Sequence, residues 1–137
     1  MYKAKSIARA VRCVRLIHQV MNIEYYRQYC LAKKGTSEEF PFDNRTLVFK
    51  VGGKMFALTD VESFESINLK CDPERAIELR EQYSAIIPGY HMNKKHWNTL
   101  VLDGSLRDSL ICSLIDDSYL LVAGSLPKKD REKLGIL

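Results

Sequence analysis

Residues 88–97 read Pro88-Gly89-Tyr90-His91-Met92-Asn93-Lys94-Lys95-His96-Trp97, and no other stretch of the chain is as rich in distinctive side chains. Proline followed by glycine predicts a turn, because proline fixes φ and glycine tolerates conformations that other residues avoid. The stretch then places two histidines, two lysines and an amide before a β-type run at residues 97–102, which begins with the only tryptophan. That run predicts a β-strand. The decapeptide is therefore interpreted as a turn that leads into a strand.

A second local signal lies upstream, where two β-type runs flank the pair Gly52-Gly53. The runs are Thr46–Val51 and Lys54–Thr59. Two glycines supply the positive φ angles of a two-residue hairpin turn. A tight turn predicts that Phe49 lies opposite Phe56 and Leu47 opposite Leu58, all on the core face of the hairpin.

Further strands and helices are indicated by capping residues and by alternation. Asn22 and Asp72 are suitable N-caps, and Pro73 fits the first position of the helix after Asp72. Residues 65–71 alternate between apolar and polar side chains, which predicts a half-buried strand. A capping box of Ser105 and Asp108 predicts a long helix over residues 106–123.

The segment between the first helix and the hairpin, residues 36–44, is predicted to be a loop. Phe40 and Phe42 flank Pro41 in this loop and are expected to anchor it to the core. The C-terminal stretch from Leu126 is expected to form a short helix or tail. The order of these elements predicts an α+β fold with two layers, a twisted antiparallel sheet with helices packed on one face.

Length and composition are those of one globular domain. The chain has 137 residues, 46% hydrophobic and 28% charged. Its longest apolar run, Tyr119–Ala123, is far shorter than the roughly 20 residues that span a bilayer. The N-terminus lacks the apolar stretch of a signal peptide. We therefore expect a cytoplasmic protein with no membrane partner.

The first twenty residues differ from the rest. Residues 1–20 carry five of the 21 basic residues and no acid, so residues 21–137 hold 16 basic and 17 acidic residues. Apolar residues at helical spacing make a basic amphipathic helix on a membrane or nucleic acid one interpretation. A transit peptide and a start placed upstream of the true one, at Met21, are the others. We favour a basic extension over residues 1–20 and a domain over 21–137, whose near-neutral charge requires any phosphate-binding site to be local.

Metal and catalytic sites are not indicated. His91 and His96 are five residues apart, which is not one helix face, and no acid or cysteine lies within residues 88–102. The four cysteines include no CxxC pair, so they are interpreted as reduced and mostly buried. No nucleophile elbow or phosphate-binding loop is present. We expect no cofactor, no metal and no enzymatic activity.

The decapeptide and three other pieces together resemble the MmcQ/YjbR-like family. The pieces are Phe40-Pro41-Phe42, Val48-Phe49-Lys50-Val51-Gly52-Gly53-Lys54-Met55-Phe56-Ala57 and Asn68-Leu69-Lys70-Cys71-Asp72-Pro73. Ser118-Tyr119 with Leu121-Val122 also fits the family's last helix. The resemblance covers about residues 21–133. It implies a fold similar to that of CyaY, the bacterial frataxin, and DNA binding through a double wing of two β-hairpins.

The iron handling of frataxins is not implied, because it relies on clustered carboxylates. The expected first helix has Glu24 and then Arg27, Lys33 and Lys34.

For nucleic acid, with DNA as the first candidate, the side-chain chemistry is suitable. Lysines contact phosphates, an amide or imidazole donates to phosphates or base edges, and an indole stacks on bases. The expected contact residues are Lys50, Lys54, His91, Asn93, Lys94, Lys95, His96 and Trp97. Two alternatives stay open: Trp97 and Tyr90 belong to the core and the lysines only to the solvated surface, or the same corner serves a protein-interaction or small-ligand module.

Overall fold

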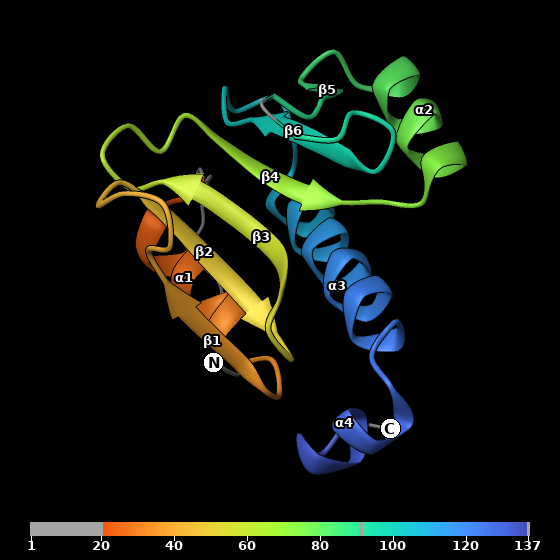
Figure 1. Ribbon diagram of the computed structural model, residues 1–137. Coiled ribbons are helices and arrows are strands. Elements are labelled where there is room, and N and C mark those ends of the chain that lie inside the picture. The colour runs from red at the N-terminus through yellow and green to blue at the C-terminus, as the bar shows by residue number, and fades with distance from the viewer. Residues whose placement is uncertain (1–20, 91, 137) are drawn as a thin grey trace.

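The computed structural model describes residues 21–90 and 92–136 of the chain. The helices are α1 (Ile23–Leu31), α2 (Pro73–Gln82), α3 (Asp108–Gly124) and α4 (Lys128–Lys133). The strands are β1 (Thr36–Glu39), β2 (Thr46–Val51), β3 (Lys54–Asp60), β4 (Ser66–Lys70), β5 (Ile86–Pro88) and β6 (Trp97–Val101). They form one six-stranded sheet in the order β1-β2-β3-β4-β6-β5 (Figure 1). All neighbouring strands are antiparallel, so the predicted α+β fold class is confirmed.

The predicted helix starts at Asn22 and Asp72 are confirmed. The Asn22 side chain accepts a hydrogen bond from the Tyr25 amide at 2.9 Å. The Asp72 carboxylate accepts from the amides of Glu74 and Arg75, and Pro73 occupies the first turn. In both helices a side-chain oxygen satisfies amides that have no partner within the helix.

The predicted hairpin register is wrong by one residue. Gly52 and Gly53 have φ of 59° and 81°, as the two-residue turn requires. However, a β-bulge between Lys50 and Phe49 pairs Phe49 with Ala57 and Val48 with Leu58. Because neighbouring side chains of a strand point to opposite faces, the shift moves Leu58 away from the core that contains Leu47 and Phe49.

A hydroxyl from α3 connects the strands beside this bulge. Ser118 is fully buried, and its Oγ accepts from the Lys70 amide at 2.9 Å and donates to the Phe56 carbonyl at 2.5 Å. β3 and β4 are paired only as far as Ala57 and Leu69. The Ser118 hydroxyl therefore satisfies two buried backbone groups beyond the end of this pairing.

Three further expectations about local structure need correction. Thr36–Glu39 is not loop but the edge strand β1, which pairs with β2. Phe40 and Phe42 do not anchor the following loop, because they are 47% and 66% exposed. The long helix α3 begins at Asp108 rather than at residue 106, since Ser105 bonds Asp103 instead of capping it.

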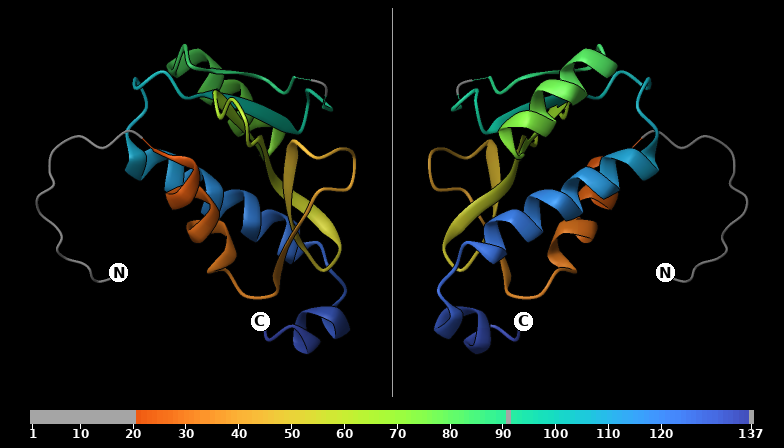
Figure 2. Two further views of the ribbon diagram at one scale, coloured as in Figure 1. Left: turned by 90° about the vertical axis from the view of Figure 1, so that its left-hand side faces the viewer. Right: turned by 90° about the vertical axis from the view of Figure 1, so that its right-hand side faces the viewer.

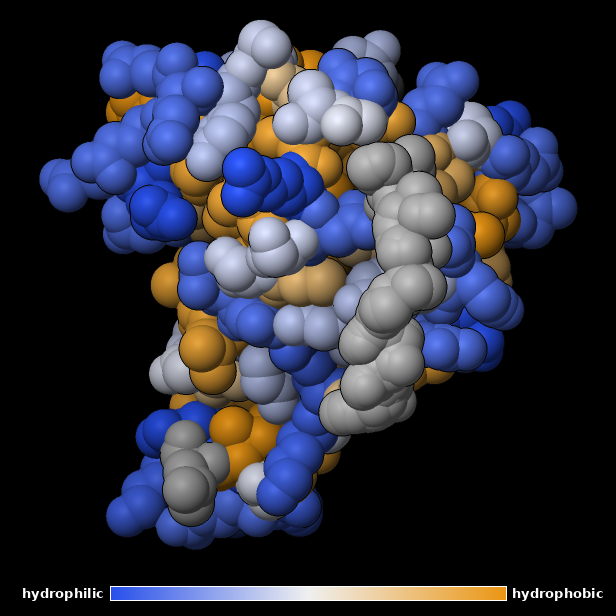
Figure 3. All heavy atoms as spheres, turned by 180° about the vertical axis from the view of Figure 1, so that it is seen from behind, coloured by the Kyte–Doolittle hydropathy of each residue, from blue (hydrophilic) through white to orange (hydrophobic). Residues whose placement is uncertain are grey.

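The helices cover one side of the sheet. Figure 2 shows α1 and α3 in a layer beside the strands, with α2 next to β5 and β6. The main core lies between these layers and includes the T-shaped ring pairs Tyr26–Phe49 and Phe56–Tyr119. From the helix side the surface is mostly hydrophilic, with scattered hydrophobic patches (Figure 3). The opposite face of the sheet, here called the helix-free face, carries the side chains of the sheet that point away from α1 and α3.

The expectations for residues 1–20 lie outside the described residues. Within residues 21–90 and 92–136, no helix is long and apolar enough to cross a membrane.

Candidate nucleic-acid interface on the helix-free face

The residues before β6 form a tight turn that is held by its own polar groups. The Asn93 side-chain oxygen accepts from the Lys95 amide at 2.9 Å, and the Asn93 carbonyl accepts from the amides of His96 and Trp97. An asparagine that bonds the backbone two residues on makes a compact turn of this kind. Lys94 and Lys95 lie at its exposed side. The Asn93 carboxamide oxygen is thus part of the turn, and the exposed carboxamide nitrogen can donate to a ligand.

Gly89 permits a close approach between the two ends of the decapeptide. The Gly89 amide donates to the Trp97 carbonyl at 2.8 Å. A side chain at this position would lie 2.8 Å from Trp97 Cβ and 2.9 Å from its carbonyl oxygen. The glycine is therefore required by packing against Trp97, and it closes the segment 89–97 into a corner.

Trp97 is buried rather than exposed on this corner. It is 7% exposed and forms a cluster with Val48 and Leu58, against which Met55 and Met92 also pack. This cluster lies on the helix-free face, because Val48 and Leu58 alternate with residues of the main core. An indole in this position does not stack on a base unless its covering side chains move. Trp97 instead joins the corner to the β2–β3 hairpin.

The structure does not place the two hairpin lysines, Lys50 and Lys54, on one surface with Lys94 and Lys95 as the sequence predicted. Lys50 points to the helix-free face, but its ammonium lies 3.0 Å from Glu39 of β1. Lys54 is exposed, and its register opposite the core residue Val51 directs it to the helix side of the sheet. The structure therefore does not bring the hairpin lysines together with Lys94 and Lys95 as one surface of unpaired charge.

Two other cations take their place, and sequence reasoning missed both as site residues. Lys70 lies directly opposite Trp97 in the β4–β6 pairing and so shares its face. Arg80 of α2 donates from Nε to Asn98 Oδ1 at 2.7 Å and from its terminal nitrogen to the carbonyls of Lys94 and Trp97. Its partners are neutral, so the guanidinium orients the lysine turn without losing its charge.

Lys70 and the turn lysines Lys94 and Lys95, together with Arg80, define the basic corner. Lys70 shares the face of Trp97, whereas Arg80 reaches the turn from the helix side, because its partner Asn98 lies opposite the core residue Leu69. Among the described residues, none of the ion pairs involves a member of this set. The polar alternation of residues 66–70 was the sequence signal for Lys70. Nothing in the sequence pointed to Arg80, because its contacts span 14 to 18 residues along the chain.

A short polar network borders the basic corner. The Thr99 hydroxyl donates to Asn68 Oδ1 at 2.5 Å and accepts from the Tyr90 amide at 3.0 Å. The backbone of Tyr90 is fixed in this way, while the residue as a whole is 67% exposed. His96 is half-buried and its carbonyl accepts from Cys71. His91 lies outside the described residues.

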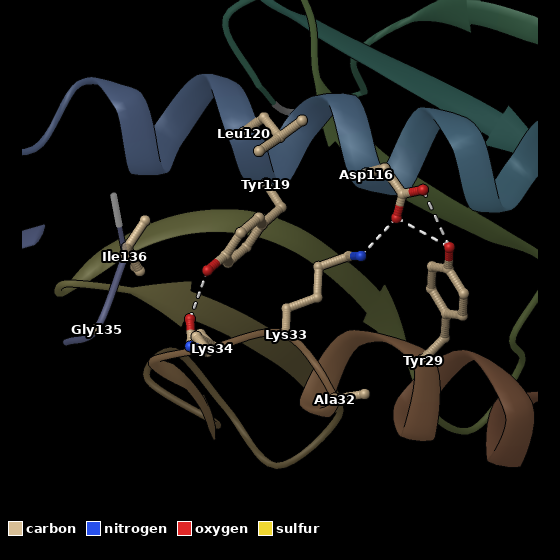
Figure 4. Close-up of a pocket in the computed structure, with 9 residues that line it drawn as sticks. All are labelled: Tyr29, Ala32, Lys33, Lys34, Asp116, Tyr119, Leu120, Gly135 and Ile136. Carbon is tan, nitrogen blue, oxygen red and sulfur yellow. Dashed lines mark hydrogen bonds and ion pairs between the residues drawn. The ribbon is translucent and has the colours of Figure 1, made fainter. Parts of the chain in front are cut away.

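A second polar cluster lies in a groove between α1, α3 and the C-terminal tail (Figure 4). Lys33 Nζ is 2.5 Å from Asp116 Oδ1, and the Tyr29 hydroxyl donates to the same carboxylate at 2.9 Å. The Lys33 ammonium also lies 4.7 Å from the centre of the Tyr29 ring. Because these three polar side chains already satisfy one another, we interpret the cluster as a link between α1 and α3.

Metal and thiol chemistry find no support in the part of the chain that the structure describes. It contains no group of three or more His, Cys, Asp and Glu residues that could hold a metal ion. Burial raises the pKa of the Cys112 thiol to about 11 and raises that of Cys30 further. Both thiols are therefore protonated at neutral pH, whereas the nucleophile is the thiolate.

Comparison with known proteins identifies the family. A model of the YjbR family matches residues 31–121. The uncharacterized protein YjbR of Escherichia coli is 41% identical over 115 residues, which cover 83% of this chain and 98% of that protein. The chain belongs to the YjbR family.

Other relatives and solved structures agree with this assignment. YyaQ of Bacillus subtilis, also uncharacterized, is 31% identical over 104 residues, covering 65% of this chain and 87% of YyaQ. The crystal structure of a Deinococcus radiodurans protein matches with a TM-score of 0.81 at 42% identity, covering 89% of this chain and 94% of that one. A Pseudomonas syringae structure matches with a TM-score of 0.64 at 33% identity, covering 74% of this chain and 99% of that one. This YjbR-family protein thus shares its fold with its solved relatives.

Proposed function

We propose that this YjbR-family protein binds nucleic acid, with DNA as the first candidate, through the basic corner, and that it is a binding protein rather than an enzyme. The observation that carries the proposal is that Lys70 lies opposite Trp97, beside the turn of Lys94 and Lys95, which Arg80 holds from the helix side. None of the ion pairs among the described residues involves these cations. The domain over residues 21–137 is nearly neutral, so this concentration is a local feature of the surface. Phosphate oxygens are the groups that such a set of donors binds best.

The residues of the corner divide into those that contact a ligand and those that hold the contact residues. Lys94 and Lys95 are exposed and bind phosphates as point charges. Arg80 fixes the turn that carries them, and the tryptophan cluster fixes the turn relative to the hairpin. A fixed turn costs less conformational entropy when it binds than a mobile loop does.

The test compares two double variants of the full chain that remove the same charge. We expect Lys94→Ala/Lys95→Ala to weaken binding of a labelled DNA oligonucleotide at low salt, measured by fluorescence anisotropy. The slope of log affinity against log salt should fall by about two, because each lost phosphate contact removes about one released counterion.

Lys128→Ala/Lys129→Ala is the matched control, because these two neighbouring lysines lie on α4 and are also exposed. Equal losses from both double variants would show diffuse attraction to a cationic protein. Absence of binding by the wild-type chain at low salt would remove the proposed function.

The alternative function is a protein-interaction or small-ligand module. One observation favours it: Phe40 and Phe42 are exposed at the end of the edge strand β1, where the sequence led us to expect buried anchors. Exposed aromatic side chains of this size often mark contact surfaces. A chain that binds no nucleic acid at low salt would make this loop the better supported site.

A further inference from the structure

We infer that the preferred ligand of the basic corner is single-stranded rather than duplex nucleic acid. This inference rests on the proposed function and adds the substrate class. It depends on the position of Tyr90, which borders the basic corner and is 67% exposed. Trp97, the aromatic residue expected among the contact residues, is buried.

Tyr90 is held beside the cations by its backbone. Its amide donates to Thr99 Oγ1, and Thr99 lies two residues after Trp97 on β6 and opposite Asn68 on β4. Lys70 lies two residues after Asn68 on the same face of β4. The Tyr90 backbone and the Asn68 carboxamide therefore lie beside Lys70 on the helix-free face, next to the turn that carries Lys94 and Lys95.

An exposed ring next to phosphate-binding cations suits an unpaired base. In a single strand each base has an open face, and a base that stacks on an aromatic side chain keeps its phosphate close to neighbouring cations. In a duplex the faces are already covered by neighbouring base pairs, so only base edges and phosphates can be contacted. The Tyr90 ring thus gains contact area from a single strand that a regular duplex does not offer.

The placement of the helices also disfavours a duplex. The wide major groove is most often read by an α-helix whose side chains reach base edges. In this protein α1 and α3 lie on the other side of the sheet from Lys70 and Trp97 (Figure 2), and α2 contributes to the corner only Arg80, which bonds backbone carbonyls of the lysine turn. The corner instead presents Tyr90 beside a tight turn with two lysines. A ring and cations of this kind contact the nucleic-acid backbone and stack on bases without distinguishing the base sequence.

The experiment measures the full chain with three ligands: a thymidine single strand of about twelve nucleotides, the uridine strand of the same length, and a hairpin duplex of equal phosphate number. At one salt concentration we expect the single strands to bind at least tenfold more tightly than the duplex. Comparison of thymidine with uridine separates DNA from RNA. The strand that binds more tightly shows whether DNA or RNA is preferred. Either preference supports a single-stranded ligand.

Variants then test the stacking contact itself. Tyr90→Ala should weaken single-strand binding by about five- to a hundredfold, the effect of losing one base–aromatic stack, and should leave duplex binding within twofold. Tyr90→Phe should retain the affinity because it keeps the ring. Phe42→Ala is the matched control, since Phe42 is 66% exposed but lies in the β1–β2 loop.

Failure of the inference and failure of the proposed function give different results. Duplex binding as tight as single-strand binding, or an unchanged affinity for Tyr90→Ala, would overturn the inference and leave nucleic-acid binding in place. An equal loss from Phe42→Ala and Tyr90→Ala would overturn the assignment of stacking to the corner. No binding of any of the three ligands would remove the proposed function together with the inference.

Discussion

Trp97 lies at the centre of the basic corner, yet its side chain serves the fold. It packs with Val48 and Leu58 on the helix-free face, and Gly89 is pressed against it. Its neighbour Tyr90, in contrast, is 67% exposed. The difference between these two aromatic residues comes from their partners in space, since both occur within one decapeptide.

Replacement of Trp97 tests its role in packing. We expect Trp97→Ala to lower the free energy of unfolding by about 3–5 kcal/mol, the usual cost of removing a large buried aromatic side chain. Trp97→Phe should cost less because it keeps part of the volume. Urea unfolding followed by circular dichroism measures both effects. A Trp97→Ala protein as stable as the wild type would contradict the buried position of the indole.

At the scale of the elements, α3 takes part in the hydrogen bonding of the sheet as well as covering it. Ser118 bonds a carbonyl of β3 and an amide of β4 next to the bulge that shifts the β2–β3 register. The helix and the bulge therefore depend on each other. The sequence does not predict the Ser118 contacts, because a serine on a helix usually lies on its exposed face.

A pair of serine substitutions on α3 tests this connection. We expect Ser118→Ala to destabilise the protein by about 1–3 kcal/mol, because it leaves a buried carbonyl and a buried amide without a partner. Ser113→Ala, at an exposed position of the same helix, should change stability by less than about 0.5 kcal/mol. Chemical denaturation of both variants gives the comparison. Equal effects would show that the Ser118 hydroxyl contributes nothing to the sheet.

At the scale of the whole molecule, several acidic residues have partners that favour their charged form. The Arg27 guanidinium donates to Glu38 and holds the pKa of that carboxyl below its ordinary value of 4.5, linking α1 to β1. Arg45 lowers the pKa of Asp60 in the same way, and backbone amides lower that of Asp43. None of these partners belongs to the basic corner.

These carboxyl groups make stability depend on pH in the acidic range. A group whose pKa is lowered by folding contributes stability above its unfolded pKa, and the contribution is lost as the pH falls through the folded pKa. We therefore expect the melting temperature to fall as the pH drops below about 4.5, the ordinary value for Glu38. Glu38→Gln should make this fall less steep, and Glu78→Gln, at an exposed position of α2, is the control. A steeper fall for Glu38→Gln than for the wild type would contradict the Arg27–Glu38 link.

Much of the local structure was readable from residues, because its causes are local. Asn22, Asp72 and Pro73 act on amides within the next three residues, and Gly52-Gly53 needs only its own φ angles. The same holds for the alternation that places Ile67 and Leu69 in the core. The composition of the decapeptide also marked the right corner of the molecule, as a turn before a strand.

The sequence by itself determined the fold class, the family and the helix and turn signals, since these follow from periodicity, caps and motifs along the chain. Only the tertiary structure decided the β-bulge, the pairing of Lys50 with Glu39, the burial of Trp97 and the entry of Arg80 and Lys70 into the basic corner. The physical reason is distance along the chain. Each of these features depends on side chains or strands that meet only after the sheet has formed, and residues 88–97 acquire their surface from partners on β2, β3, β4 and α2.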